Sequence, residues 1–355
     1  MPSAEVSGQH VRRSDGLLRK ADCKILIHPF LFVHPMALLK SVILLALVAF
    51  NLFTVGHGWR LDKASCDKHP IKDRLLKALP KALELVNDAI ESNKANEEET
   101  VTIRKMLFPD LPFFKVKEVQ GALEKIQKAM TTNSGREAGV KDMRDPIIFC
   151  DQSRWEKVPS AKPGEPDAYR NKVTKKFDPN PNGLLARCMN EKSMTGYSSR
   201  FEGEDAEDSQ DFIQLCPWWL KWLEKDDFQK DINKWDDKKW AEWNMPEYDF
   251  KQGEEGYVDS VYAFERTLIH EFSHTANGGR TVDLKGPDGT QQYGWLKCAD
   301  PPRGFDMWTN ADTLALFCVA SNLANHKMQR PLQNGNLERM CPGKGKKYHA
   351  KCEVM

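Results

Sequence analysis

Two histidines and a glutamate near residue 270 have types and spacing that could hold a metal ion. His270 and His274 are four residues apart, so on a helix they lie on one face and can fill two corners of a tetrahedral zinc site. Glu271 is turned aside from that face, where it can reach a water bound to the metal. This HExxH spacing predicts peptide hydrolysis by a zinc-activated water, with Glu271 as general base.

The alternative interpretation is an ordinary helix that carries two surface histidines and an incidental glutamate. Four apolar residues at helical spacing favour a buried helix instead: Val261, Phe264, Leu268 and Phe272. The Asn-Gly-Gly sequence at 277–279 is expected to end this helix, because glycine readily adopts the left-handed conformation. The surface-helix interpretation leaves this glycine turn and the aspartate after it unexplained.

A catalytic zinc needs a third protein ligand and one open position. The longer pattern HExxHxxGxxH is absent, because Asn277 and Arg280 stand where its glycine and third histidine would be. Chain reach permits several other ligands, and spacing alone does not choose among them. The candidates are Asp283, Asp288, Asp306, Asp312, His326 and His349.

Three stretches, HEFSHTANGGRTVD, QQYGW and NADTLALF, resemble the deuterolysin-type metalloendopeptidases, or aspzincins. These are secreted fungal proteases, and the catalytic domains of lysine-specific metalloendopeptidases are among them. The resemblance spans most of residues 64–320, although only residues 265–317 are specific. It implies one Zn²⁺ held by His270, His274 and Asp283, and it implies a catalytic tyrosine that steadies the transition state, at Tyr293.

This sequence also departs from the family pattern. Asp283 and Tyr293 are ten residues apart, whereas three residues separate them in the family, and residues 284–290 read as an insertion. Asp288, inside the insertion, therefore remains an alternative ligand, and Tyr293 could belong to a structural Tyr-Gly turn. Asp312 could orient a ligand histidine, line the pocket or cap the following helix. Lysine-preferring members of the family carry additional acidic residues just after the turn that corresponds to residues 310–312. Here residues 313–315 are Thr-Leu-Ala, so we do not expect lysine specificity.

The N-terminal region reads as a leader for secretion. Residues 36–58 have the basic start and the short apolar core of a signal peptide. Residues 1–35 form an N-terminal extension that is either not translated or cytoplasmic. Residues 59–355 are expected to form a single zincin-like catalytic domain with insertions. We expect an extracellular monomer with no stable membrane association once the leader is cleaved.

The cysteine count agrees with an oxidising compartment. Eight of the nine cysteines follow residue 58, and an even number in a secreted chain is expected to pair. The family resemblance implies the pairs Cys66–Cys150 and Cys188–Cys216. It gives no partners for the four C-terminal cysteines, which are Cys298, Cys318, Cys341 and Cys352.

Overall charge gives no support to nucleic-acid binding, because 52 basic and 51 acidic residues leave a net charge of +1. We therefore expect protein or peptide substrates and no nucleic-acid partner. Residues 202–255 are strongly acidic, which indicates either a solvated surface or a rim that favours cationic substrates. A competing function is a secreted binding protein or effector that keeps a zincin scaffold without catalysis, because insertions near 156–210, 221–256 and before Tyr293 could block the cleft or build a partner surface.

Hydrophobic periodicity indicates which elements surround the candidate site. Residues 67–130 read as helices, and Pro80 is expected to kink or split the first of them. Its predicted apolar stripe consists of Leu75, Leu76, Leu79, Leu83 and Val86. Residues 145–151 and those just before Pro217 read as strands, and 156–183 as a long loop or irregular hairpin. With the family resemblance, this predicts an α+β, mostly helical zincin-like fold with a small twisted sheet beside the HExxH helix.

Overall fold

The computed structural model describes residues 58–109, 115–131, 145–159, 168–172, 175, 177, 183–190, 194–201, 210–225, 257–302, 304–327 and 329–340. These residues belong to one compact unit, Gly56–Met355. The predicted N-terminal extension and all but the last residue of the predicted signal peptide lie outside them. Of the helices in this part of the chain, none is long and apolar enough to cross a bilayer.

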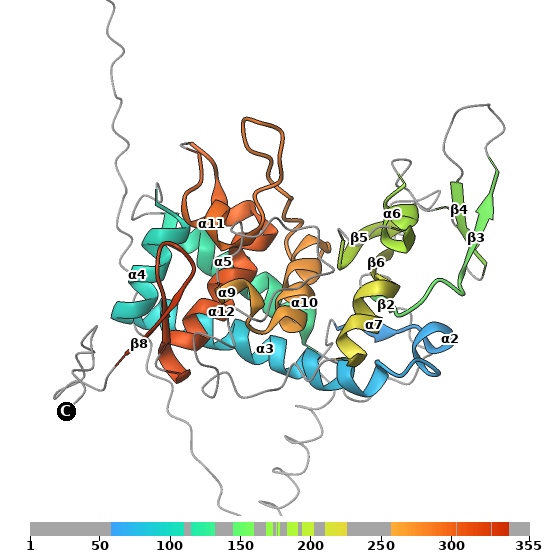
Figure 1. The fold of residues 1–355 in the computed structure, drawn as a ribbon, viewed down its shortest axis with the longest axis horizontal. Helices are drawn as coiled ribbons and strands as arrows, with labels where there is room; N and C mark the ends of the chain where they lie inside the picture. The colour runs from blue at the N-terminus through green and yellow to red at the C-terminus, as the bar shows by residue number, and fades with distance from the viewer. Residues whose placement is uncertain are drawn as a thin grey trace, which may run out of the picture. The chain divides into compact units, whose positions relative to one another are not determined.

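Helices and small mixed sheets make up the described residues, so the chain belongs to the general α+β class (Figure 1). The helices are α2 (Lys63–Cys66), α3 (Lys72–Ala95), α4 (Glu98–Leu107), α5 (Val116–Met130), α6 (Leu184–Asn190), α7 (Pro217–Lys225), α9 (Tyr257–Ser260), α10 (Ala263–His274), α11 (Gly294–Ala299), the 3-10 helix η4 (Met307–Thr309) and α12 (Ala311–Lys327). The strands are β1 (Arg60–Leu61), β2 (Ile147–Phe149), β3 (Trp155–Val158), β4 (Ala168–Asn171), β5 (Gly196–Phe201), β6 (Gln210–Leu215), β7 (Gln329–Pro331) and β8 (Leu337–Arg339).

A four-stranded sheet has the order β1-β2-β6-β5. The first three strands are parallel, and β5 pairs antiparallel with β6 at the end of this order, with Ser198 opposite Ile213. All residues of β6 are buried, as expected for a strand covered on both faces. Strands β3 and β4 form a separate antiparallel pair, which agrees with the irregular hairpin rather than the long loop, the two alternatives predicted for residues 156–183.

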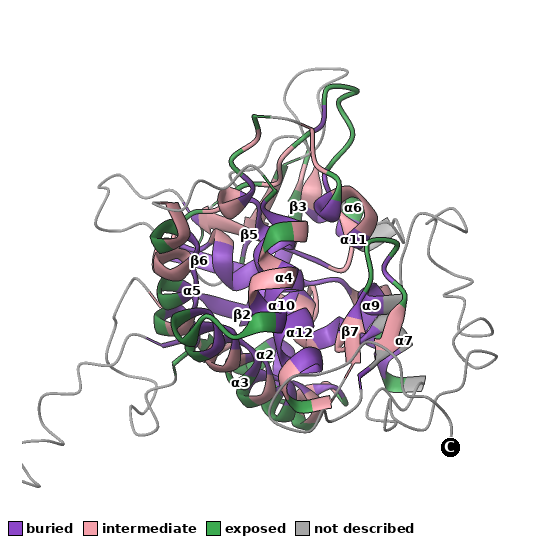
Figure 2. Cartoon of the chain, turned by 90° about the vertical axis from the view of Figure 1, so that its left-hand side faces the viewer, coloured by how far each residue is buried: buried purple, intermediate pink, exposed green. Residues whose placement is uncertain are grey.

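The helix α10, which carries the HExxH sequence, lies between other helices and the sheet (Figure 1). It packs against α3, α5 and α12 on one side and against β5 on the other. The neighbouring α12 is buried from Ala311 to Ala324, and Figure 2 shows both helices in the buried centre of the molecule. A helix buried on all sides needs apolar or hydrogen-bonded residues all round, which is the composition of α12. The core thus holds α10 rigidly.

The long helix α3 bears on two predictions. Of the two expectations for Pro80, a kink or a split, the split is wrong, because α3 runs unbroken from Lys72 to Ala95. Proline removes the hydrogen bond to the carbonyl of Leu76, but Leu76 is 41% exposed, so water can reach this side of the helix. Leu76 was predicted in the buried stripe, and this prediction is wrong. The buried face of α3 instead includes Ala78 and Ala82, whose small side chains let neighbouring helices approach.

Two disulfides confirm the pairings that the family resemblance implied. Cys66 in α2 is bonded to Cys150, which follows β2. Cys188 in α6 is bonded to Cys216, between β6 and α7. Both bonds join residues around the four-stranded sheet. Each lowers the conformational entropy of the unfolded chain by closing a loop, and so stabilises the folded state.

The expectation that all eight cysteines pair is wrong for Cys298 and Cys318. Both are free thiols with no exposed surface, Cys298 in α11 and Cys318 in the middle of α12. The Cys298 thiol donates to the Gln292 carbonyl at 3.3 Å, and burial raises the pKa of both thiols above the usual value of 9.0. Cys341 and Cys352 lie outside the described residues.

Candidate metal centre

The buried face predicted for the HExxH helix is confirmed. Phe264, Leu268 and Phe272 on α10 are at most 2% exposed, so the helix is anchored in the core along one side. The helix ends at His274, three residues before the predicted Asn-Gly-Gly stop. Gly278 is required just beyond, because a Cβ there would collide with the carbonyl oxygen of Phe272. The chain can therefore fold back closely onto the end of α10.

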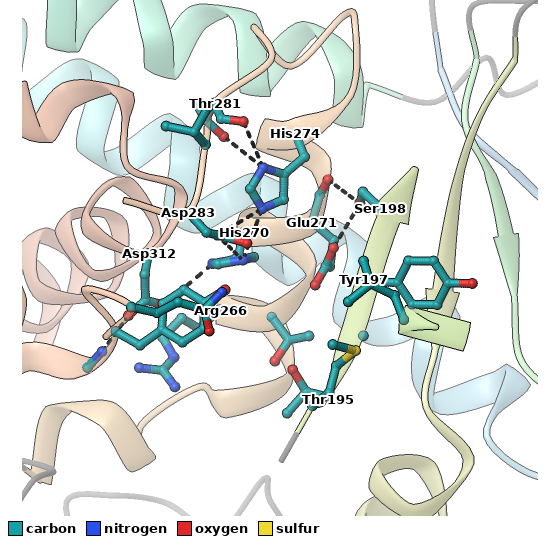
Figure 3. Close-up of a pocket in the computed structure, with 18 of the residues that line it drawn as sticks. Thr195, Tyr197, Ser198, Arg266, His270, Glu271, His274, Thr281, Asp283 and Asp312 are labelled. Atoms are coloured by element: carbon teal, nitrogen blue, oxygen red, sulfur yellow. Dashed lines mark hydrogen bonds and ion pairs between the residues drawn. The ribbon is translucent and has the colours of Figure 1, made fainter. Parts of the chain in front are cut away.

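Three side-chain atoms converge beside α10, as Figure 3 shows. The Nε2 atoms of His270 and His274 are 3.1 Å apart. Asp283 Oδ1 lies 3.3 Å from Nε2 of His270 and 3.2 Å from Nε2 of His274. Among the described residues, these three form the one group of histidine, cysteine and acidic side chains that is compact enough to hold a metal ion.

Hydrogen bonds at the far side of each imidazole ring turn the Nε2 lone pairs toward this point. Nδ1 of His274 is 2.8 Å from the carbonyl oxygen of Thr281, and a carbonyl can only accept, so Nδ1 carries the proton. Nδ1 of His270 faces Oδ1 of Asp312 at 3.5 Å, which favours the same tautomer. Oriented in this way, both rings can donate an electron pair from Nε2.

The three converging atoms fit a zinc ion. Asp283 Oδ1 is buried with the two histidine Nε2 atoms facing it, and a buried carboxylate oxygen is costly unless a positive charge stands beside it. Ligands at tetrahedral zinc, with bonds of about 2.0–2.2 Å, are separated by roughly 3.3–3.6 Å, close to the distances between these atoms. Two imidazoles and one carboxylate are also a donor set that catalytic zinc accepts. The geometry therefore suits a divalent ion with one position left open.

When no metal ion is bound, the pKa values of His270 and Asp283 depend on each other's charge. Burial alone would lower the pKa of His270, but Asp283 and Asp312 hold it well above the usual value of 6.5. Burial would raise the pKa of Asp283, but the two histidines hold it far below the usual value of 3.8. When no metal ion is bound, the positive charge of protonated His270 therefore balances the negative charge of Asp283.

This coupling predicts opposite pH dependences for the metal-free and zinc-loaded chains. In the metal-free chain the stabilising charge on His270 is present below about pH 6.5 and is lost as pH rises through the raised pKa. Zinc requires neutral His270, so its contribution grows as pH rises. The difference in Tm between zinc-loaded and chelator-treated protein should widen from about pH 5 to pH 8. A pH-independent difference, measured by calorimetry, would argue against this site.

Glu271 lies beside the converging atoms, on the side that faces β5. It is 3% exposed, and the Ser198 hydroxyl is 2.8 Å from its Oε2. Burial raises the pKa of Glu271 above the usual 4.5, while His270 and His274 act in the opposite direction. A buried carboxylate with a raised pKa is well suited to take up a proton.

Tyr293 reaches the same site despite its distance in sequence. Its ring meets the ring of His270 edge-on, with centroids 5.6 Å apart, and it lines the same cavity. Burial first, and the charge of Asp283 second, raise the pKa of Tyr293 above its usual value of 10.0. The phenol therefore stays protonated and can donate a hydrogen bond.

Residues 284–292 form an excursion whose two ends are joined by hydrogen bonds. Asp283 and Tyr293 stand on either side of these ends and can therefore meet. The Gln292 backbone N–H donates to the Leu284 carbonyl at 2.8 Å. Asn310 ties both ends together, since its Oδ1 accepts from the Leu284 N–H at 3.1 Å and its Nδ2 donates to the Gln292 carbonyl at 3.0 Å. These three hydrogen bonds form a pinch at the ends of the excursion, which brings Asp283 and Tyr293 close together.

Asp288, the alternative ligand, is not brought to the cluster. It is fully exposed at the tip of the excursion, where it accepts hydrogen bonds from the N–H and hydroxyl of Thr290. Of the other candidates, His326 pairs with Asp88 at 3.2 Å, and Asp306 lies 3.6 Å from Lys115. His349 lies outside the described residues.

Asp312 contacts two parts of the site, and the sequence left its role open. One oxygen faces His270, while Oδ2 accepts from the Gly294 N–H at 2.7 Å, next to Tyr293. Burial would raise its pKa, but Arg266 and His270 hold it below the usual 3.8, so it stays charged. Asp312 therefore links the orientation of His270 to the position of the Tyr293 backbone.

A cavity of about 490 Å³ opens onto these residues. Its walls come from α10, from β5 and from the chain around Asp283 and Tyr293. Gly196 and Ser198 on β5 were not predicted as site residues. No local sequence signal marks them, because Gly196 and Ser198 precede His270 by 74 and 72 residues.

Comparisons of the chain with known protein families, with curated proteins and with solved structures found no match. The motifs between His270 and Asp312 carry the resemblance to aspzincins.

Proposed function

We propose that this chain is a secreted, zinc-dependent endopeptidase of the aspzincin type with a zincin-like fold. The convergence of His270 Nε2, His274 Nε2 and Asp283 Oδ1 beside Glu271 carries this proposal. When bound, zinc supplies an electrophile that polarises a peptide carbonyl and lowers the pKa of water toward about 7. The remaining chemistry belongs to side chains of the chain itself.

Glu271 acts as the general base. Its carboxylate lines the cavity, so it can accept a proton from the attacking water and then deliver it to the departing amine. Burial favours its protonated form, which makes uptake of this proton easier. Gly196 on β5 lies beside this carboxylate, since a Cβ at that position would be 3.4 Å from Oε1 of Glu271, in van der Waals contact.

Tyr293 stabilises the charge that develops on the carbonyl oxygen. Its hydroxyl keeps its proton because burial and the carboxylate of Asp283 raise its pKa. A protonated phenol at the edge of the cavity is a hydrogen-bond donor for an oxyanion. Removal of such a donor typically lowers kcat about 100- to 1,000-fold.

The substrate is an extended segment of polypeptide. Within the described residues β5 has a strand partner on one side only, and Gly196, Tyr197 and Ser198 line the cavity. An edge strand offers backbone N–H and carbonyl groups to an extended peptide, in the manner of β-augmentation. Binding through the backbone requires no free chain end, which favours cleavage within a chain.

The competing function is a secreted binding protein or effector with an inactive zincin scaffold, in which the insertions block the cleft or build a partner surface. The excursion at 284–292 is pinched at its base, and Glu271 remains in the wall of an open cavity. This observation favours catalysis. The insertions within 202–209 and 226–256 lie outside the described residues.

The test is digestion of denatured casein by the purified chain, followed by mass spectrometry of the products. We expect cleavage at internal bonds, abolished by a zinc chelator and restored by added zinc. If the chain binds one zinc and cleaves neither casein nor a mixed peptide library, it is a binding protein and the endopeptidase proposal is wrong.

A further inference from the structure

The general base of the proposed reaction is in contact with the outermost strand of the sheet. Ser198 on β5 places its hydroxyl 2.7 Å from the backbone oxygen of Glu271 and 2.8 Å from Oε2 of the same residue (Figure 3). Both atoms are acceptors, so the hydroxyl donates its proton toward Glu271 in either case. In the described part of the chain, Ser198 supplies the hydrogen bond to this carboxylate.

The face of β5 is shaped to receive Glu271. Residues two apart on a strand point to the same side, so Gly196 and Ser198 share one face. A Cβ at Gly196 would lie 3.1 Å from the Gln214 carbonyl oxygen, which is tighter than ordinary packing, and 3.4 Å from Glu271 Oε1, at the short limit of ordinary van der Waals contact. The strand thus leaves space for one carboxylate oxygen and offers a donor to the other.

We propose that Ser198 is a positioning residue that holds the Glu271 carboxylate in its catalytic orientation across the gap between β5 and α10. The inference rests on the proposed function, because the orientation of Glu271 matters only if it moves a proton. A glutamate side chain has three rotatable torsions, and one fixed hydrogen bond selects among its rotamers. The same strand would bind the substrate, so substrate and base are placed by one element.

The experiment uses a matched pair of variants, Ser198→Val and Ser198→Thr. Both add similar bulk and both suit a strand, but only threonine keeps a hydroxyl. Ser199→Ala is the control for the strand itself, because Ser199 is the next residue and points to the opposite face. For each zinc-loaded protein, kcat and KM on one peptide, zinc content and Tm are measured.

We expect kcat of Ser198→Val to fall about 10- to 100-fold, the effect of losing one hydrogen bond to a charged group, with KM and zinc content unchanged. Ser198→Thr should recover most of this loss, and Ser199→Ala should stay within about threefold of wild type. Equal kcat in the valine and threonine variants would overturn the proposal. So would a loss that appears only in KM.

A second measurement separates this proposal from the proposed function. If the wild type holds zinc but cleaves no peptide, the endopeptidase proposal fails, and crystal structures of the two Ser198 variants then decide. The Glu271 carboxylate should keep its place in Ser198→Thr and leave it in Ser198→Val. The same Glu271 rotamer in both variants would overturn the positioning role.

Discussion

Replacing Asp283 with alanine is expected to remove the zinc from the protein. Asp283 Oδ1 lies 3.2–3.3 Å from both histidine Nε2 atoms and is their one carboxylate partner in the cluster. Without it, two imidazoles remain, and catalytic zinc sites use three protein ligands. We expect zinc, measured by mass spectrometry of the purified chain, to fall from about one per molecule to near zero, with affinity at least about 100-fold weaker.

The matched control is Asp288→Ala. Asp288 carries the same side chain five residues away, but it is fully exposed and turned into its own loop by Thr290. Its zinc content should equal that of the wild type. Retention of zinc by folded Asp283→Ala, or its loss from Asp288→Ala, would show that the ligand set is wrong.

The substitution Glu271→Gln should abolish turnover while leaving zinc in place. Glutamine has the shape of glutamate and can still contact Ser198, but it cannot accept a proton from water. Loss of a general base typically lowers kcat about 100- to 10,000-fold. Zinc content and KM should change little, because Glu271 is not one of the three residues whose side chains converge on the metal position.

Glu265→Gln is the control on the same helix. Glu265 does not line the cavity, and its nearby charges are those of Arg74 and Lys81. Burial raises the pKa of Glu265, as it does for Glu271. The substitution therefore repeats the chemical change without touching the proposed reaction. If Glu271→Gln digests casein as fast as Glu265→Gln, Glu271 is not the base.

Local spacing explains how much of the site could be predicted from the sequence. His270, Glu271 and His274 lie within one turn of α10, so helical geometry alone brings the histidines together. The choice between Asp283 and Asp288 could not be made this way, because it depends on how residues 284–292 fold. The structure brings Asp283 to the histidines through the pinch that Asn310 closes.

Contacts between distant segments account for what the sequence did not predict. Ser198 and Glu271 are 73 residues apart, and nothing near either residue indicates the other. Leu76 has the spacing of a buried residue, but the packing of α3 turns the buried face away from it. The free thiols of Cys298 and Cys318 follow from their places inside packed helices, where cysteine count gives no information.

The α+β class and the two disulfides were predictable for different reasons. Apolar stripes at helical spacing mark α3, α5 and α10, and a short apolar run marks β2. Among many possible pairings of cysteines, spacing offers no choice, and the two correct pairs came from the family resemblance alone.

The most direct test of the account is a zinc titration of the metal-free chain during hydrolysis of one peptide. The rate should start near zero, rise with each addition and break at about one zinc per molecule, the capacity expected for a site with one set of three ligands. A chain that binds one zinc but never cleaves the peptide, or that cleaves it equally well without zinc, would contradict the proposed function.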